Sequence, residues 1–147
     1  MAKIIITEDE RIIAEDLKLT LQSFGHEVTA ICTSGEEAVT KTRELHPDLI
    51  FMDIQLKGKL TGIEAAHILK NSKIPVIFCT AYSDHKTIMQ AASVDHSGYL
   101  IKPIMENELK CILDKTLNGK SSKKPKRFIP KNRRGFDLDD LDMVQHS

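Results

Sequence analysis

The chain has 147 residues, of which 41% are hydrophobic and 29% are charged. That length is enough for one domain with a sizeable core and a short appendage. The hydrophobic fraction excludes a wholly disordered chain, and no apolar run approaches the roughly 18 residues of a membrane span. The three cysteines lie far apart, which excludes a disulfide scaffold and a CxxC metal or redox motif. We therefore expect a soluble, cytoplasmic protein without a membrane segment.

The net charge of zero conceals two parts of opposite sign. Residues 120–147 carry eight Lys or Arg and four Asp, a net charge of +4, so residues 1–119 carry −4. Residues 120–135 show no helical or strand period, and a segment of about 28 residues cannot enclose a core of its own. We predict one domain over residues 1–119 and a flexible tail over residues 120–147, first basic and then acidic, that is disordered or docks on a partner.

Five short apolar runs recur along the first 119 residues. They predict strands over residues 3–7, 27–32, 49–53, 76–80 and 98–101. Three of them are almost continuously apolar, which is typical of strands that are covered on both faces of a parallel sheet.

Helical patterns separate these runs. They predict helices over residues 10–24, 35–45 and 62–70, a fourth helix capped by Asp84, and a fifth that ends at Asn118-Gly119. Ser34 to Glu37 and Thr61 to Glu64 have the spacing of a capping box. The strict alternation predicts an α/β fold with a doubly wound, five-stranded parallel sheet and helices on both faces.

Ligands bind beyond the carboxyl ends of the strands in such a sheet. The polar residues expected there are Glu8, Asp9 and Glu10 after the first strand, Asp53 after the third, Thr80 after the fourth and Lys102 after the fifth. Carboxylates that lie close together repel each other unless a cation is bound, and Mg²⁺ prefers carboxylates, water and a phosphate oxygen as ligands.

A phosphoryl group fits the remaining residues. Lys102 can bind a phosphoryl oxygen, Thr80 can donate a hydrogen bond to another, and Asp53 can accept the group as an aspartyl phosphate. The residues therefore predict Mg²⁺-dependent phosphoryl transfer onto Asp53.

Over about residues 2–118 the sequence resembles the receiver domain of two-component response regulators. The motifs that carry the resemblance are Glu8-Asp9, Met52-Asp53, Gly62-Ile63-Glu64, Thr80-Ala81 and Tyr99-Leu100-Ile101-Lys102-Pro103. The resemblance, and not the periodicity, implies the flavodoxin-like strand order 2-1-3-4-5. It also implies a signalling module rather than an enzyme that turns over a small molecule.

The resemblance assigns a role to each site residue. Asp53 would be phosphorylated by a sensor histidine kinase or a phosphotransfer protein. Mg²⁺ would be held by Glu8, Asp9, Asp53 and the backbone carbonyl of Gln55. The phosphoryl group would be bound by Thr80, the backbone of Ala81 and Lys102, with a cis peptide bond between Lys102 and Pro103.

The resemblance also implies a switch. Thr80 and Tyr99 would form the switch pair, in which the hydroxyl group moves to the phosphate and the ring turns inward behind it. Phosphorylation would thereby repack the face made by the fourth helix, the fifth strand and the fifth helix, which would bind a downstream partner or a second copy of the chain.

One segment departs from the family pattern. Many receivers have a Met-Pro pair soon after the phosphorylated Asp, whereas this chain has Leu56-Lys57-Gly58-Lys59-Leu60-Thr61, which is one residue longer. No proposed ligand side chain lies in this segment. The departure therefore concerns the shape of the loop and the choice of kinase, and not the chemistry.

Two other classes of protein with a similar sheet or chemistry lack support in this sequence. Haloacid-dehalogenase-like phosphatases need an acid two residues after the nucleophile, where this chain has Gln55. A flavodoxin-type carrier needs a phosphate-binding loop after the first strand, where three acidic residues would repel the flavin phosphate. A DNA-binding transcriptional regulator, whose effector is the basic tail or lies outside this sequence, remains an alternative. The tail lacks a helix-turn-helix pattern, and we expect weak, non-specific nucleic-acid contact at most.

Overall fold

The structure, a computed structural model, describes residues 1–81, 85–92 and 98–118. Its strands are β1 (Lys3–Thr7), β2 (Glu27–Cys32), β3 (Leu49–Met52), β4 (Val76–Thr80) and β5 (Gly98–Ile101). Its helices are α1 (Arg11–Ser23), α2 (Gly35–Leu45), α3 (Gly62–Ile68), the 3-10 helix η1 (Leu69–Ser72), α4 (His85–Ala92) and α5 (Glu106–Asn118). The predicted tail and the predicted cap at Asp84 lie outside the described residues.

The five strands form one parallel sheet in the order β2-β1-β3-β4-β5. This order confirms the flavodoxin-like arrangement that the resemblance implied, and the alternation of strands and helices is as predicted. The order of neighbours reverses around β1 and β3, so that these two strands lie side by side in the middle of the sheet. Their carboxyl ends therefore mark the position at which open α/β sheets bind ligands.

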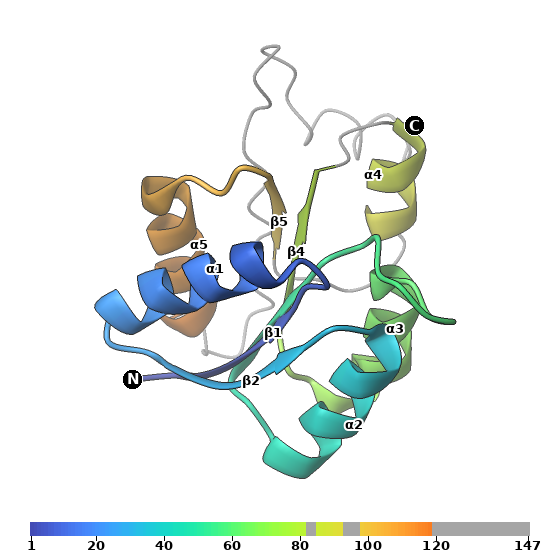
Figure 1. Cartoon of the computed structure of the whole chain (residues 1–147), viewed down its shortest axis with the longest axis horizontal. Coiled ribbons are helices and arrows are strands. Elements are labelled where there is room, and N and C mark those ends of the chain that lie inside the picture. The colour runs from blue at the N-terminus through green and yellow to red at the C-terminus, as the bar shows by residue number, and fades with distance from the viewer. Residues whose placement is uncertain (82–84, 93–97, 119–147) are drawn as a thin grey trace.

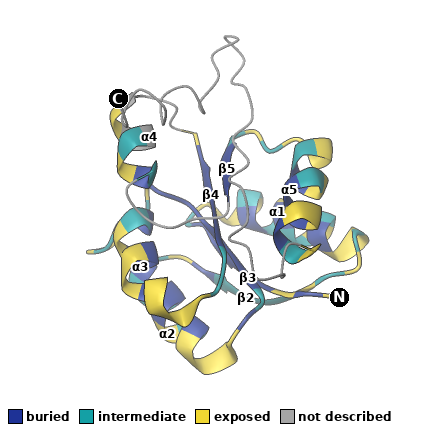
Figure 2. Cartoon of the chain, turned by 180° about the vertical axis from the view of Figure 1, so that it is seen from behind, coloured by how far each residue is buried: buried dark blue, intermediate teal, exposed yellow. Residues whose placement is uncertain are grey.

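Helices cover both faces of the sheet, with α1 and α5 on one side and α2, α3 and α4 on the other (Figure 1). Each face has its own cluster of buried side chains. The α1–α5 cluster includes Ile4, Ile6, Leu17, Leu21, Leu109 and Ile112. The α2–α3–α4 cluster includes Ile5, Met52, Ala65, Phe78, Ala91 and Tyr99. The helices turn their buried sides to the sheet and their exposed sides outward (Figure 2).

The two clusters explain why the central strands are almost continuously apolar. Successive side chains of a strand point to opposite faces. In β1, Ile5 enters the α2–α3–α4 cluster, whereas Ile4 and Ile6 enter the α1–α5 cluster. A polar side chain at any of these positions would be buried in apolar surroundings, and polar residues appear only where the strand ends.

The helix starts follow the predicted capping signals with one difference. At α3 the capping box is complete, because Thr61 and Glu64 bond each other's backbone N–H groups. At α2 the Ser34 side chain accepts a bond from Glu37 N–H as predicted, at 3.1 Å. The Glu37 carboxylate, however, accepts its bond from Thr33 N–H at 2.8 Å and not from Ser34. This corrects the second half of the predicted box.

The helix predicted over residues 62–70 ends earlier than expected. Regular α-helix stops at Ile68, and the chain continues as the 3-10 helix η1. Lys73 then adopts a left-handed conformation with φ 62°, and Pro75 follows two residues later. Proline cannot continue a helix, and a tightened last turn is a common way to end one before it.

None of the helices in the described part of the chain combines the length and the apolar character that a membrane span requires.

Candidate functional site

Three carboxylates meet at the carboxyl ends of β1 and β3. Glu8, Asp9 and Asp53 each place a carboxylate oxygen within 4.8 Å of the others. Backbone hydrogen bonds hold them there, since Asp53 N–H donates to Thr7 O and Glu8 N–H donates to Cys32 O, both at 2.9 Å. The continued ladder between β1 and its two neighbours thus fixes the acidic group.

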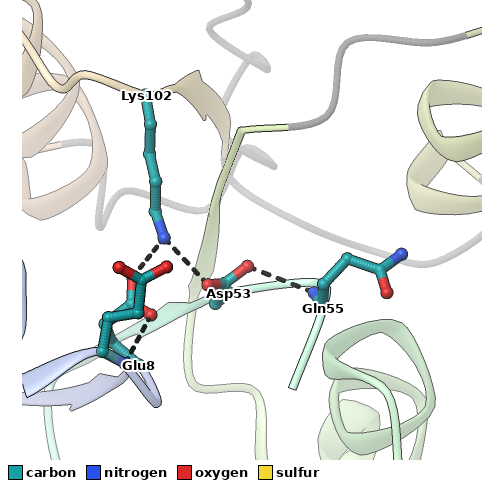
Figure 3. A network of polar contacts seen from close by, with 5 residues as sticks. Glu8, Asp53, Gln55 and Lys102 are labelled. Carbon is teal, nitrogen blue, oxygen red and sulfur yellow. Dashed lines mark hydrogen bonds and ion pairs between the residues drawn. The ribbon is translucent and has the colours of Figure 1, made fainter. Parts of the chain in front are cut away.

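Lys102 brings a cation into this group from the end of β5. Its Nζ donates hydrogen bonds to Asp53 Oδ2, at 2.8 Å, and to Glu8 Oε1 (Figure 3). Its backbone N–H donates to Thr80 O at 2.8 Å, which continues the pairing of β4 with β5. The Lys102–Pro103 peptide bond is cis. The four residues predicted from three separate strand ends therefore lie in one place.

The site is largely shielded from solvent, and its ionisation is shifted accordingly. Glu8 is 4% exposed and Asp53 is 6% exposed. Burial raises the pKa of Glu8 to about 7, although its bonds with Lys102 and with Glu10 N–H partly oppose the rise. Burial by itself would lower the pKa of Lys102, but the bonds with Asp53 and Glu8 outweigh it and the pKa is raised. The ammonium group therefore stays charged and compensates part of the acidic charge.

The donor set fits a small, hard divalent cation. Three carboxylates and one ammonium leave an excess of negative charge in a buried place, and a cation with oxygen ligands removes it. Gln55 contributes only its backbone to this set, and not its side chain. Its N–H donates to Asp53 Oδ1 at 3.1 Å, whereas its side chain is exposed and points away from Asp53 (Figure 3).

Thr80 and Tyr99, the predicted switch pair, lie inside the molecule on one face of the sheet. Both are buried, and Tyr99 belongs to the α2–α3–α4 cluster. Thr80 is two residues from Phe78, which pairs with Tyr99, so strand alternation places Thr80 on the same face. Ala81, which is exposed, follows directly after the end of β4. The Tyr99 side chain is buried in this structure.

The sequence motifs contained a further site residue whose role was not predicted. A Cβ atom at Gly62 would lie 1.9 Å from the carbonyl oxygen of Asp53, a distance that no side chain can tolerate. Gly62 N–H also donates to Ile54 O at 2.9 Å. The first turn of α3 therefore lies directly against the backbone of Asp53, and only glycine allows this approach. The Thr61-Gly62-Ile63-Glu64 motif predicted the helix start but not this contact.

Comparisons with known proteins agree with this geometry. A family model described as the response regulator receiver domain matches residues 4–114. The sensory transduction protein LytT of Oceanobacillus iheyensis is 35% identical over 133 residues, which cover 84% of this chain and 52% of LytT. The DNA-binding response regulator MtrA of Mycolicibacterium paratuberculosis is 32% identical over 108 residues, which cover 73% of this chain and 47% of MtrA. The chain spans about half the length of these curated relatives.

Solved structures of receiver domains are also similar. The signal receiver domain of a modulated diguanylate cyclase from Desulfovibrio desulfuricans G20 has a TM-score of 0.76 and 34% identity, covering 81% of this chain and 95% of that one. The N-terminal domain of a response regulator/sensory box/GGDEF protein from Carboxydothermus hydrogenoformans has a TM-score of 0.71 and 35% identity, covering 79% and 94%.

Proposed function

The chain belongs to the response regulator receiver domain family, and on that premise we propose that Asp53 accepts a phosphoryl group from a sensor histidine kinase or a phosphotransfer protein. Receiver domains are signalling modules and not themselves enzymes that turn over small molecules. The observation that carries the proposal is the buried Asp53 with Lys102 Nζ at 2.8 Å and two further carboxylates beside it.

The transfer needs little more than a positioned nucleophile and charge compensation. A carboxylate oxygen of Asp53 attacks phosphorus, the bond from phosphorus to the donor nitrogen breaks, and its electron pair leaves with the donor. Lys102 exchanges its bond with Asp53 for one with a phosphoryl oxygen, because a charged donor forms a strong hydrogen bond with a phosphoryl oxygen. The Thr80 hydroxyl and the backbone N–H of Ala81 donate to the other phosphoryl oxygens.

Receiver domains bind Mg²⁺ at an acidic pocket, and we propose that Glu8, Asp9, Asp53 and the Gln55 carbonyl hold it here. When bound, the ion neutralises carboxylate and phosphoryl charge as the oxygens approach each other. Lys102 bonds one oxygen of Glu8 and one of Asp53 in this structure, so the ammonium group would compete with the ion for these oxygens. Where the ion displaces it, Lys102 becomes available for the phosphoryl group.

The proposed output is a change of the face formed by α4, β5 and α5. Thr80 O accepts a hydrogen bond from Lys102 N–H, and Tyr99 is in the same cluster as Ala91 of α4. A hydroxyl group drawn toward a phosphoryl group on Asp53 leaves space beside Tyr99, and a packed cluster responds by repacking. We propose that the repacked face binds a protein partner or a second copy of this chain.

Intact mass after incubation with acetyl phosphate tests the chemistry. The wild type is expected to gain one phosphoryl group with Mg²⁺ and none with EDTA. Asp53→Ala is expected to gain none under either condition, whereas Asp16→Ala, which removes an exposed acid of α1, should behave as wild type. If no adduct forms, beryllofluoride binding separates rapid hydrolysis from an inert site. Failure of both would overturn the proposal.

A second output is a DNA-binding activity, because the mycobacterial relative is named a DNA-binding response regulator. Residues 120–147 supply eight basic side chains that could contact phosphates. An anisotropy titration with duplex DNA at low salt is expected to show weak binding without sequence preference. Sequence-specific nanomolar binding would make this the primary output instead.

A further inference from the structure

The β3–α3 loop (residues 53–61) is held from outside by Glu36, in the first turn of α2. Glu36 Oε1 accepts a hydrogen bond from Leu60 N–H at 2.6 Å, across 24 positions of sequence. Gly58 adopts φ 106°, and a Cβ atom there would lie 2.8 Å from Glu36 Oε2. One carboxylate therefore bonds the loop at Leu60 and lies against its backbone at Gly58.

The same loop is tied to the phosphorylation site at its other end. Gln55 N–H donates to Asp53 Oδ1 at 3.1 Å, and Gly62 N–H donates to Ile54 O at 2.9 Å. Leu56 and Leu60 are half-buried against the α2–α3–α4 cluster. The loop thus has one anchor on Asp53, one at the start of α3 and one on α2.

The neighbouring residue Glu37 shows that the bond of Glu36 is not part of helix capping. Glu37 accepts from Thr33 N–H at 2.8 Å and so serves the start of its own helix. Glu36 lies one position earlier in the same turn, but its Oε1 accepts a hydrogen bond from Leu60 N–H of the loop. Both carboxylates are favoured near a helix N-terminus, but they accept hydrogen bonds from different parts of the chain.

We propose that Glu36 is a positioning residue that holds the β3–α3 loop so that the backbone of Gln55 stays against Asp53, and that it thereby raises the affinity of the site for Mg²⁺. The inference rests on the proposed function, because Gln55 is there a backbone ligand of the ion. The physical reason is preorganisation, since a loop already held in place loses less freedom when the ion binds.

Hydrogen exchange of the metal-free protein tests the first half of the proposal. Glu36→Ala is expected to speed exchange in residues 55–60 by about three- to tenfold, the range for losing one hydrogen bond. Glu36→Gln keeps an acceptor oxygen and is expected to exchange nearly as wild type. Glu37→Ala is the matched control, because it removes the adjacent carboxylate and a bond to Thr33 but leaves the loop alone. Equal exchange in all four proteins would overturn the proposal.

Calorimetric titration with Mg²⁺ tests the second half. Glu36→Ala is expected to weaken Mg²⁺ binding by about fivefold, with Glu36→Gln and Glu37→Ala within about twofold of wild type. Faster loop exchange with unchanged Mg²⁺ affinity would overturn the positioning role and leave a structural bond. If the wild type itself binds no Mg²⁺ and takes up no phosphoryl group, the proposed function has failed, and the metal-free exchange result still reports separately on whether Glu36 holds the loop.

Discussion

Glu8 is 4% exposed, and the pKa of its carboxyl group is about 7 in the folded protein against a reference value of 4.5. The shift arises mainly because burial disfavours the ionised form. The hydrogen bonds with Lys102 and Glu10 N–H lower the pKa of Glu8 but do not offset the effect of burial, and the negative charge of Asp53 raises this pKa further. A divalent cation is the group that would complete the compensation.

The stability of the metal-free protein should therefore depend on pH through Glu8. Between about pH 4.5 and 7 the unfolded chain has lost this proton while the folded protein keeps it, so the contribution of Glu8 falls as pH rises and is constant above 7. Relative to Glu8→Gln, the wild type is expected to lose on the order of 2 kcal/mol of unfolding free energy across this window. Urea unfolding in EDTA at several pH values measures it.

Glu44→Gln provides the control, since Glu44 is an exposed residue at the end of α2. The unfolding free energy of Glu44→Gln is expected to change with pH as that of the wild type does. If the unfolding free energy of Glu8→Gln also changed with pH as that of the wild type does, burial would not hold the proton on Glu8.

The first turn of α3 is the element that touches the site most closely. The absence of a side chain at Gly62 lets the helix start at the carbonyl of Asp53, and the capping box of Thr61 and Glu64 fixes where it starts. The helix N-terminus thus supports the backbone of the proposed phosphoacceptor. Any side chain at Gly62 must displace either the helix or Asp53.

Gly62→Ala is expected to destabilise the fold by about 3 kcal/mol or more, because the new methyl group overlaps a buried backbone that cannot move freely. Phosphorylation of Asp53 by acetyl phosphate should fall together with stability. Thr61→Ala is the comparison, since losing the cap costs about 1 kcal/mol without touching Asp53. Urea unfolding and intact mass measure the two effects. A Gly62→Ala protein as stable as Thr61→Ala would show that the contact is not needed.

Elements with local signals were predictable from the sequence. The strands were predicted because burial on both faces leaves continuous apolar runs such as Ile4–Ile6, and helices α2 and α3 because their capping residues have a fixed spacing. The end of α3 at Ile68 was not predicted, because Pro75 limits how far the helix can extend but does not fix the residue at which the 3-10 helix begins. The prediction that Glu37 accepts a hydrogen bond from Ser34 N–H was wrong, because the N–H group of Thr33 is also within reach of the Glu37 carboxylate.

The candidate site was predictable to the extent that a parallel sheet gathers strand ends at one edge. That rule brings Asp53 and Lys102 together from 49 positions apart. It does not say what each oxygen bonds, and so the sharing of Lys102 between Glu8 and Asp53 was not foreseen. Contacts such as that of Glu36 with Leu60 have no local signal at all, because they depend on how α2 lies beside the loop.

Across the whole molecule, Lys102 links the three strands that carry the site. It extends from the end of β5 to residues that follow β1 and β3, and its side chain is 13% exposed. In the metal-free protein this one ammonium compensates two buried carboxylates, which would otherwise destabilise each other. The same bonds compete with Mg²⁺ for the oxygens of Glu8 and Asp53. We therefore expect that removing the charge of Lys102 lowers the stability of the metal-free protein and raises its affinity for Mg²⁺.

Lys102→Met keeps an unbranched side chain that is one atom shorter and removes its charge. In EDTA at pH 8 it is expected to lower the unfolding free energy by about 2–3 kcal/mol, because two buried carboxylates lose their counter-charge. Its Mg²⁺ affinity is expected to rise several-fold, since no ammonium competes, while phosphorylation by acetyl phosphate slows because a phosphoryl oxygen loses its charged donor. Urea unfolding, calorimetric titration and intact mass follow the three changes, with Lys70→Met at an exposed position as control. If Lys102→Met weakened Mg²⁺ binding, the two cations would not compete for these oxygens, and Lys102 would instead hold the ligands in place for the ion.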